Sequence, residues 1–277
     1  MFVKKIGAGL SGAFALGGAF LWSTAASALP QDWETGFQPA ASPVMERIED
    51  FHKELLVIIT LVSLFVLALL VWIVLRYNQR RNPVPSKTAH NTLLEVAWTI
   101  IPVIILVIIA IPSFRLLYYE MDIPTPDVTI KAIGKQWFWS YEYPASNFTF
   151  DSLGLSNADA DKAHEPHLLG VDNAVYVPVN KVIEVETTGA DVIHSWAVPQ
   201  FGVKMDAVPG RINHTWFKAT QIGTFYGECS ELCGARHAFM PIEVHVVSEA
   251  DYQKWLAGAK KKFAAINDTS ATQVAAK

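Results

Sequence analysis

Two uncharged hydrophobic runs in the first half of the chain constrain its fold more than any other feature. The first extends from Leu55 to Leu75 and the second from Val96 to Phe114, and neither contains a charged residue. At 1.5 Å per residue, a helix of this length reaches roughly the 30 Å of a bilayer core. The sequence therefore predicts two transmembrane helices, over residues 55–75 and 96–117.

A third apolar segment lies at the N-terminus, behind two lysines, and ends in the small residues Ala26, Ser27 and Ala28. A basic start, a short apolar stretch and an Ala-x-Ala ending are typical of a secretory signal peptide, although a third, small-residue transmembrane helix is the alternative. We expect a signal peptide over residues 1–28 and, after it, an outer N-terminal segment over residues 29–54.

The loop between the two predicted spans, residues 76–95, is basic. Its charged residues are Arg76, Arg80, Arg81, Lys87 and, at its end, Glu95. Loops rich in Lys and Arg stay on the cytoplasmic side of a membrane, so we expect this loop in the cytoplasm and both chain ends in the periplasm. Together with a signal peptide, this arrangement predicts a multi-pass protein of a bacterial inner membrane.

The second half of the chain has the pattern of an exported β domain. The apolar share of 51% is high for an ordinary soluble protein, and the 17% of charged residues is high for one wholly embedded in lipid. From Val128 onward, short β-rich runs are separated by Gly, Pro and Asn: VTIKAIG, WFWSYEY, AVYVPV, KVIEVETT, HSWAVP, HTWFKA, GTFYGE and MPIEVHVV. Many short strands at this spacing predict a β-sandwich or barrel, here over residues 122–250.

Two segments of this half depart from the strand pattern. Residues 157–166 (NADADKAHEP) are polar and lack periodicity, so we expect an exposed loop there, with no evident role for His164 or His167. Over residues 251–277 a helical pattern (DYQKWLAGAKKKF) gives way to a polar, Ala-rich end. This predicts a C-terminal helix followed by a mobile tail.

The only two cysteines lie in a stretch that is dense in metal-binding side chains. Its donors are Cys229, Glu231, Cys233, His237 and Met240, and His194 supplies a second imidazole from further upstream. Sulfur and imidazole donors suit copper better than Mg²⁺ or Ca²⁺, and a thioether is a poor ligand for Zn²⁺. The donor set therefore favours a copper site held in a loop between two strands.

Two other interpretations fit part of this stretch. Two cysteines in an exported domain most often form a disulfide, and two cysteines with two histidines could close a tetrahedral zinc site. Haem attachment is excluded because CxxCH does not occur. Neither the disulfide nor the zinc site uses Met240, and neither needs so many donors so close together.

Three strings carry a resemblance to a known family: HSWAVPQFGVKMDAVPGRIN, YGECSELCGARHAFMPI and GKQWFWSYEY. They resemble the signature stretches of cytochrome c oxidase subunit II, and the order of signal, two spans and β domain is similar as well, from about Asp32 to Leu256. The resemblance implies a membrane-anchored α plus all-β chain. Its two-helix transmembrane hairpin would precede a cupredoxin-like Greek-key β-sandwich.

The resemblance also implies a dinuclear copper centre, CuA. Cys229 and Cys233 would bridge both copper ions as thiolates, and His194 and His237 would each bind one. Met240 and the backbone carbonyl of Glu231 would be weak ligands. The Glu231 carboxylate would in addition reach a Mg²⁺ or Mn²⁺ ion shared with the catalytic subunit, although an exposed glutamate is as readily a solvated surface residue.

In this family, the position of Trp137 is where electrons from cytochrome c enter, although the surrounding aromatic cluster also suits core packing. The resemblance implies an acidic docking field around it, formed by Glu142, Asp151, Asp172 and Asp191, each of which could equally be a plain surface charge. Asn147 stands where some relatives carry an acid. The formal net charge of −4 permits a basic protein partner and argues against nucleic acid.

Glu95 is a lone acid at the cytoplasmic start of the second span, where an interfacial role is the simplest interpretation. The resemblance instead implies a position at the mouth of the proton path called the K-channel in the catalytic subunit, where a carboxylate could collect protons.

The function implied is electron transfer within a respiratory enzyme. Cytochrome c would reduce CuA through Trp137, and CuA would reduce haem in subunit I, the catalytic haem–copper subunit, where O₂ reduction is coupled to proton pumping. The chain would thus be part of an oxidoreductase that has further subunits, without reducing oxygen alone. Three alternative functions are disfavoured. Subunit II of a quinol oxidase lacks the copper ligands present here, and a membrane-tethered copper carrier does not need the aromatic cluster. Nitrous oxide reductase has a similar copper site but lacks the two spans.

Overall fold

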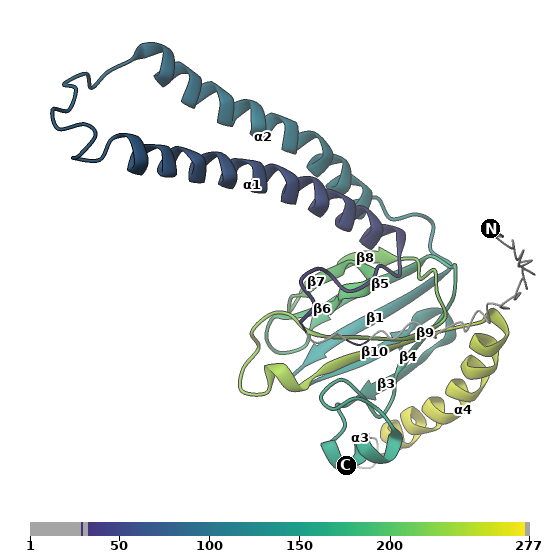
Figure 1. The fold of residues 1–277 in the computed structure, drawn as a ribbon. Helices are drawn as coiled ribbons and strands as arrows, with labels where there is room; N and C mark the ends of the chain where they lie inside the picture. The colour runs from purple at the N-terminus through teal and green to yellow at the C-terminus, as the bar shows by residue number, and fades with distance from the viewer. Residues whose placement is uncertain (1–28, 30–32, 275–277) are drawn as a thin grey trace, which may run out of the picture.

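The computed structural model describes residue 29 and residues 33–274, and the predicted signal peptide, 1–28, lies outside the described residues. Two long helices, α1 (Pro43–Arg76) and α2 (Thr92–Met121), extend side by side away from a β-sandwich (Figure 1). Both are long and apolar enough to cross a membrane, and none of their most apolar stretch is buried within the described part of the chain. The sequence-predicted spans, 55–75 and 96–117, lie within them.

The start of α1 is anchored on the sandwich, well before the predicted span begins. Ser42 is the N-cap: its side chain accepts from the backbone N–H of Met45 and donates to the carbonyl of Phe201 over 2.7 Å. Ala41 adds two backbone hydrogen bonds, to Gln200 and from Thr220. Because a capped and buried helix end resists fraying, the apolar helix is fixed relative to the β domain.

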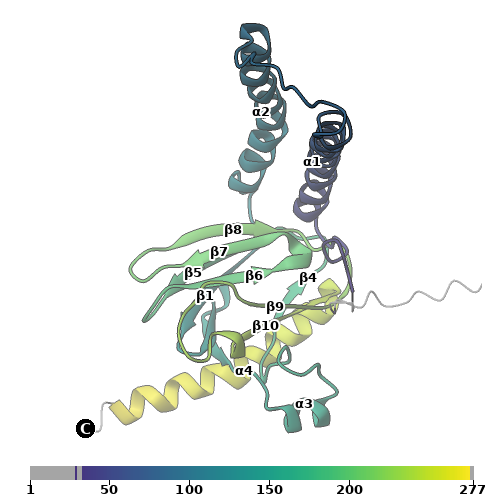
Figure 2. The ribbon, with the colours of Figure 1, turned by 60° about the vertical axis from the view of Figure 1, so that its left-hand side comes forward.

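The β domain consists of two five-stranded mixed sheets packed face to face (Figure 2). One sheet has the order β3 (Phe148–Ser152), β2 (Phe138–Tyr143), β1 (Val128–Lys135), β5 (Ile183–Gly189) and β8 (Asn213–Phe217). The other has the order β4 (Val175–Pro178), β10 (Pro241–Val247), β9 (Gly223–Cys229), β6 (His194–Val198) and β7 (Val203–Ala207). Short 3-10 helices lie at η1 (Pro144–Ser146), η2 (Pro199–Phe201) and η3 (His237–Phe239). The predicted two-helix, β-sandwich fold class is confirmed.

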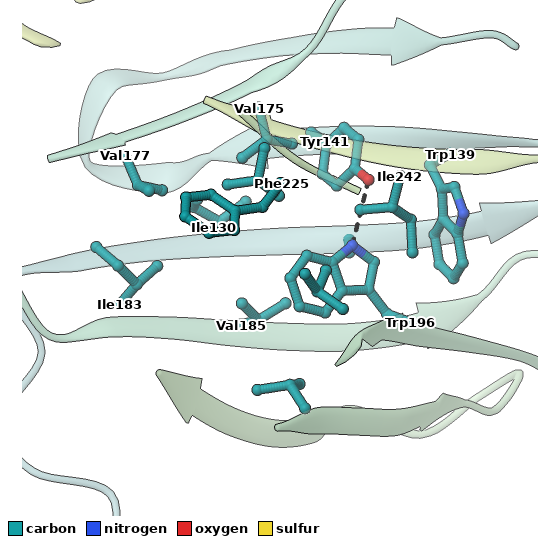
Figure 3. Close-up of a cluster of buried hydrophobic side chains, with 14 of the residues drawn as sticks. Ile130, Trp139, Tyr141, Val175, Val177, Ile183, Val185, Trp196, Phe225 and Ile242 are labelled. Atoms are coloured by element: carbon teal, nitrogen blue, oxygen red, sulfur yellow. Dashed lines mark hydrogen bonds between the residues drawn. The ribbon is translucent and has the colours of Figure 1, made fainter. Parts of the chain in front are cut away.

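The core between the sheets combines aliphatic and aromatic side chains. Trp196 of β6 and Tyr141 of β2 are both 1% exposed, and the indole Nε1 of Trp196 donates to the Tyr141 hydroxyl over 3.2 Å (Figure 3). A buried Trp N–H needs such an acceptor. The pair ties the two sheets together next to the end of β9, where the cysteines lie.

Two expectations about the β domain are corrected. Residues 157–166, expected to be an irregular loop, include the short helix α3 (Asn157–Ala163), because Ser156 caps the N–H of Asp159 and buried Ala160 packs the turn onto the domain. The C-terminal helix α4 (Glu249–Val274) extends into the stretch expected to be a tail. It lies across the side of the sandwich away from α1 and α2 (Figures 1 and 2).

Candidate metal centre

The metal-binding side chains meet at one end of the second sheet. His194 is the first residue of β6 and Cys229 is the last residue of its neighbour β9, with Trp196 directly opposite Cys229. The chain then turns through Cys233 and η3, which carries His237, and Met240 ends this turn just before β10. Strand pairing thus fixes one imidazole and one thiolate, and a short loop between two adjacent strands supplies the remaining donors.

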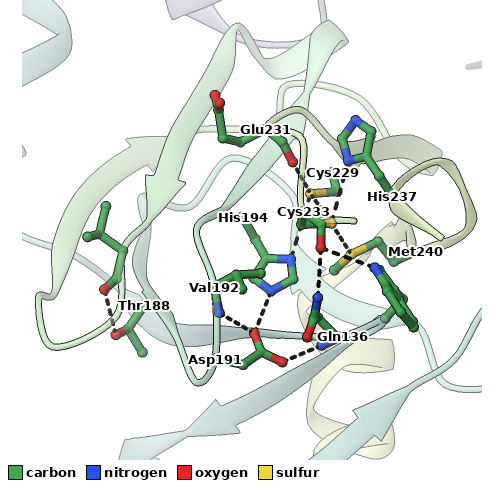
Figure 4. A network of polar contacts seen from close by, with 12 residues as sticks. Gln136, Thr188, Asp191, Val192, His194, Cys229, Glu231, Cys233, His237 and Met240 are labelled. Carbon is green, nitrogen blue, oxygen red and sulfur yellow. Dashed lines mark hydrogen bonds and ion pairs between the residues drawn. The ribbon is translucent and has the colours of Figure 1, made fainter. Parts of the chain in front are cut away.

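The donors form two similar halves. On one side, the Cys229 Sγ lies 3.9 Å from the His194 Nδ1 and 3.3 Å from the carbonyl oxygen of Glu231 (Figure 4). On the other, the Cys233 Sγ lies 3.6 Å from both the His237 Nδ1 and the Met240 Sδ. The two sulfur atoms are 3.8 Å apart. Each half therefore offers a thiol, an imidazole and a weaker neutral donor.

This arrangement fits two soft metal ions better than the alternatives. Cys229 and Cys233 are free rather than joined in a disulfide. The donor atoms of His194, Cys229 and Cys233 lie within 4.8 Å of one another, but His237 does not join that group, as a single tetrahedral zinc ion would require. Together the donors present would offer two ions two thiolates, two imidazoles and two weaker ligands, a set that suits copper.

The two thiols differ in acidity. Burial opposes ionisation of Cys229, but the His194 imidazole and nearby backbone groups outweigh it and lower the pKa to about 6. Burial and the neighbouring Cys229 raise the pKa of Cys233 to about 12. Without metal, the pair therefore holds a single proton near neutral pH, and a bridging metal pair would have to displace it.

Asp191 lies directly behind the copper ligand candidate His194. Its Oδ1 accepts from the His194 Nε2 at 2.8 Å and from the backbone N–H of Val192 at 2.7 Å, and its Oδ2 accepts from the backbone N–H of Gln136 at 2.7 Å (Figure 4). Burial raises the Asp191 pKa, but these donors together hold it below its ordinary value. The carboxylate is thus ionised and fully engaged within the chain.

Gln136 and Trp137 cover the other side of the site. The Gln136 side chain donates to the carbonyl of Cys233 over 2.9 Å, and the Trp137 Nε1 reaches the same oxygen over 3.3 Å. A hollow of about 250 Å³ next to Trp137 is also lined by Leu153, Arg236 and Phe239. Half-buried Trp137 therefore connects this surface hollow to the backbone of a cysteine.

The four acids expected to form a docking field all have partners inside the chain. Glu142 pairs with Lys131 at 3.3 Å, and Asp151 pairs with Lys135 at 3.7 Å. Asp172 accepts from the backbone N–H of Leu153, one of the residues that line the hollow. Asp172 and Asp191 therefore lie next to the hollow, whereas Glu142 pairs across the sheet near the far end of β2.

The two carboxylates with other expected roles lie apart from the sulfur cluster. The side chain of Glu231 is exposed and points away from the thiols, while its backbone carbonyl faces Cys229 (Figure 4). Glu95 lies at the start of α2, where it pairs with His90 at 2.8 Å and accepts from the backbone N–H of Asn91. In this structure Glu95 closes the first turn of the helix.

Sequence reasoning missed Gln136 as part of the site, and it assigned Asp191 only to the surface. The sole signal for Gln136 is its place directly before Trp137 in GKQWFW, because its contact with Cys233 exists only in the folded chain.

The loop histidines also have local roles: His167 pairs with Asp161 at 2.7 Å and His164 caps α3 with a left-handed backbone.

Comparison with known proteins adds a family to this geometry. The family model for the periplasmic domain of cytochrome c oxidase subunit II matches residues 128–247, and the model for its transmembrane domain matches residues 30–116. A probable cytochrome c oxidase subunit 2 of Rickettsia bellii (strain RML369-C) is 50% identical over 242 residues, covering 87% of this chain and 89% of that protein. This chain belongs to the cytochrome c oxidase subunit II family.

Two further similar proteins are a relative and a solved structure. Cytochrome c oxidase subunit 2 of Cereibacter sphaeroides is 46% identical over 248 residues, which cover 83% of this chain and 82% of that one. A crystal structure of the periplasmic domain of subunit II of cytochrome oxidase from Bradyrhizobium japonicum is 59% identical, covers 51% of this chain and 99% of that chain, and has a TM-score of 0.48. As a member of the cytochrome c oxidase subunit II family, the chain is an oxidoreductase subunit with a membrane anchor, as its sequence predicts.

Proposed function

We propose that this chain accepts electrons from cytochrome c at a dinuclear copper centre and passes them to haem in the catalytic subunit of the oxidase. The observation that carries the proposal is the doubled donor set, two thiols 3.8 Å apart with an imidazole and a weaker donor beside each. A single metal ion or a disulfide would leave half of these donors without a use. Membership of the cytochrome c oxidase subunit II family supports the same conclusion.

When bound, a copper pair held by Cys229, Cys233, His194 and His237 would supply a one-electron carrier whose charge is shared over both ions. The chain's own contribution is to hold the ligands still. His194 is 0% exposed and packs edge-on against Trp139, with ring centroids 6.0 Å apart, and Met240 is 1% exposed. Because donors that are already fixed move little when the charge changes, such a site keeps the reorganisation during electron transfer small.

Trp137 is the proposed point at which electrons enter. It lines the surface hollow and donates to the carbonyl of Cys233, so one side chain contacts both the candidate docking surface and a cysteine ligand. Asp172, beside this hollow, would attract a basic cytochrome c, together with Glu142 and Asp151 at longer range. Acidic groups in such positions speed the encounter more than they add affinity.

The remaining roles concern the partner subunit and the membrane. The exposed carboxylate of Glu231 is available for a Mg²⁺ or Mn²⁺ ion shared with subunit I, as a hard oxygen donor suits these ions. The basic loop 76–95 would face the cytoplasm and the β domain the periplasm of the inner membrane. Glu95 would then lie on the side from which protons are taken up.

Copper quantitation and electron paramagnetic resonance on the full-length chain in detergent, loaded with copper, test the proposal. We expect about two coppers per chain and a seven-line hyperfine pattern from one electron shared between them. A four-line mononuclear signal, or binding of one zinc ion in place of copper, would refute the dinuclear centre.

A further inference from the structure

Asp191 stood among the acids expected at the docking surface, yet its contacts point inward. Three N–H donors converge on its carboxylate, from His194, Val192 and Gln136, all at 2.7 or 2.8 Å. The carboxylate of Asp172, the other acid beside the hollow, accepts from one backbone N–H, that of Leu153. Two acids at similar places on the surface therefore have different surroundings, and only one of them contacts a candidate copper ligand.

The contact with His194 decides which nitrogen of this ring can bind metal. The Nδ1 faces the Cys229 Sγ at 3.9 Å, whereas the Nε2 faces the Asp191 carboxylate at 2.8 Å. An ionised carboxylate only accepts hydrogen bonds, so Nε2 keeps its proton whether the imidazole is neutral or charged. Nδ1, which faces the sulfur cluster, is then the nitrogen that can give up its proton to bind metal.

The ring also has little freedom to turn. His194 is completely buried, and a Cβ placed on Gly134 would lie 2.7 Å from its ring carbons. Asp191 holds the remaining edge of the ring, and its second oxygen holds the backbone of Gln136, whose side chain donates to Cys233. One carboxylate thus links the His194 half of the site to the Cys233 half.

We propose that Asp191 is a positioning residue for the copper centre, which fixes the tautomer and orientation of His194 and braces Gln136 against Cys233. The inference rests on the proposed copper site. Outer carboxylates that orient a ligating imidazole typically account for 10- to 100-fold in metal affinity. The Asp191 side chain is partly exposed, but its main effect is on the metal ligands.

Two variants of Asp191 and one matched control separate a role in positioning the copper ligands from a role in docking cytochrome c. Asp191→Asn is nearly isosteric but has one acceptor oxygen where the carboxylate uses two, so at least one of the three N–H donors loses its partner. Asp191→Ala removes the acceptor of all three N–H donors. Asp172→Asn removes the same charge beside the same hollow and also disturbs one backbone N–H, but it contacts no candidate copper ligand.

In the full-length chain in detergent, we expect Asp191→Ala to retain copper about tenfold more weakly than the parent in competition with a chelator. The copper retention of Asp191→Asn should fall between that of Asp191→Ala and that of the parent, and its copper hyperfine pattern should change. Asp172→Asn should match the parent in copper retention and in hyperfine pattern. Parent-like copper retention and spectra in both Asp191 variants, with only a higher KM for cytochrome c in the assembled oxidase, would overturn the inference and leave Asp191 as a docking acid.

A copper-free measurement keeps this inference distinguishable from the proposed function. Nitrogen-15 spectra of the histidine-labelled parent chain report which ring nitrogens of His194 carry protons, and we expect Nε2 to be protonated. An unprotonated Nε2 would overturn the inference even if copper binds. If the parent bound no copper pair, the proposed function would fail, and the protonation of Nε2 would still decide the orienting role of Asp191.

Discussion

The indole Nε1 of Trp137 donates a hydrogen bond to the backbone carbonyl of Cys233, 3.3 Å away. In the described structure, Trp137 and Gln136 are the two side chains lining the surface hollow that make such a contact to a cysteine. A change at this one residue should therefore affect electron delivery without removing any metal ligand.

Trp137→Phe keeps an aromatic ring in the hollow but loses the N–H donor. We expect the assembled oxidase to oxidise cytochrome c at least about tenfold more slowly, a rise of roughly 1.4 kcal/mol in the barrier, with unchanged copper content. Stopped-flow reduction by cytochrome c measures this. Trp255→Phe, which removes an indole on α4, is the matched control and should react like the parent; equal rates in both variants would rule out the role of Trp137.

Gly134→Ala should disturb the site from behind His194. The added Cβ would lie 2.7 Å from the imidazole ring, closer than real contacts allow, so the ring must shift away from its place beside Cys229. We expect copper retention to fall on the order of tenfold. Gly258→Ala, with open space around it in α4, serves as control and should stabilise its helix by about 0.5–1 kcal/mol.

Met240 and Cys229 should respond differently to substitution. Met240→Leu conserves volume at a site that is 1% exposed, so it should cost less than about 1.5 kcal/mol and leave about two coppers bound, with an altered reduction potential. Cys229→Ser removes a bridging sulfur and should abolish the seven-line spectrum. Metal analysis with potentiometry distinguishes them, and loss of both coppers in Met240→Leu would contradict the assignment of Met240 as a weak ligand.

Copper binding should release more protons at acid pH. The pKa of Cys229 is lowered to about 6 and that of Cys233 is raised to about 12, so between these values the cysteine pair holds one thiolate and one proton that metal must displace. As the pH falls through about 6, Cys229 gains a proton too. We expect at least about one more proton released per chain below this pH than above it, with correspondingly weaker binding, because the imidazole ligands also gain protons at acid pH. A pH-stat titration would refute this if proton release stayed constant from pH 5 to 8.

Tyr141→Phe should destabilise the sandwich through an unpaired donor. The Trp196 indole N–H would lose its buried acceptor, at a cost of about 1–3 kcal/mol in the free energy of unfolding. Denaturant unfolding followed by tryptophan fluorescence measures this. Combining it with Trp196→Phe removes both partners, and the two effects should then be less than additive; strict additivity would contradict an energetic link between the two side chains.

The strands that sequence patterns missed are both at sheet edges. Eight runs were expected as strands and are strands, but β3 (FTFDS) and β7 (VKMDA) were not recognised. Edge strands are short and carry charged residues such as Asp151 and Lys204, which protect an open edge. Their local signal is weak, so pairing with a neighbouring strand decides their structure.

By itself, the sequence determined the two apolar helices, most of the sandwich and the identity of the metal-binding donors, because hydrophobic periodicity and donor chemistry are local properties. It did not reveal that Asp191 accepts from Gln136, that Gln136 reaches Cys233, or that Cys229 lies beside His194. Those relationships join residues at or near the ends of β1, β6 and β9, which are 35 to 97 positions apart in the chain. Only the register and packing of the folded sheets bring them within hydrogen-bond distance.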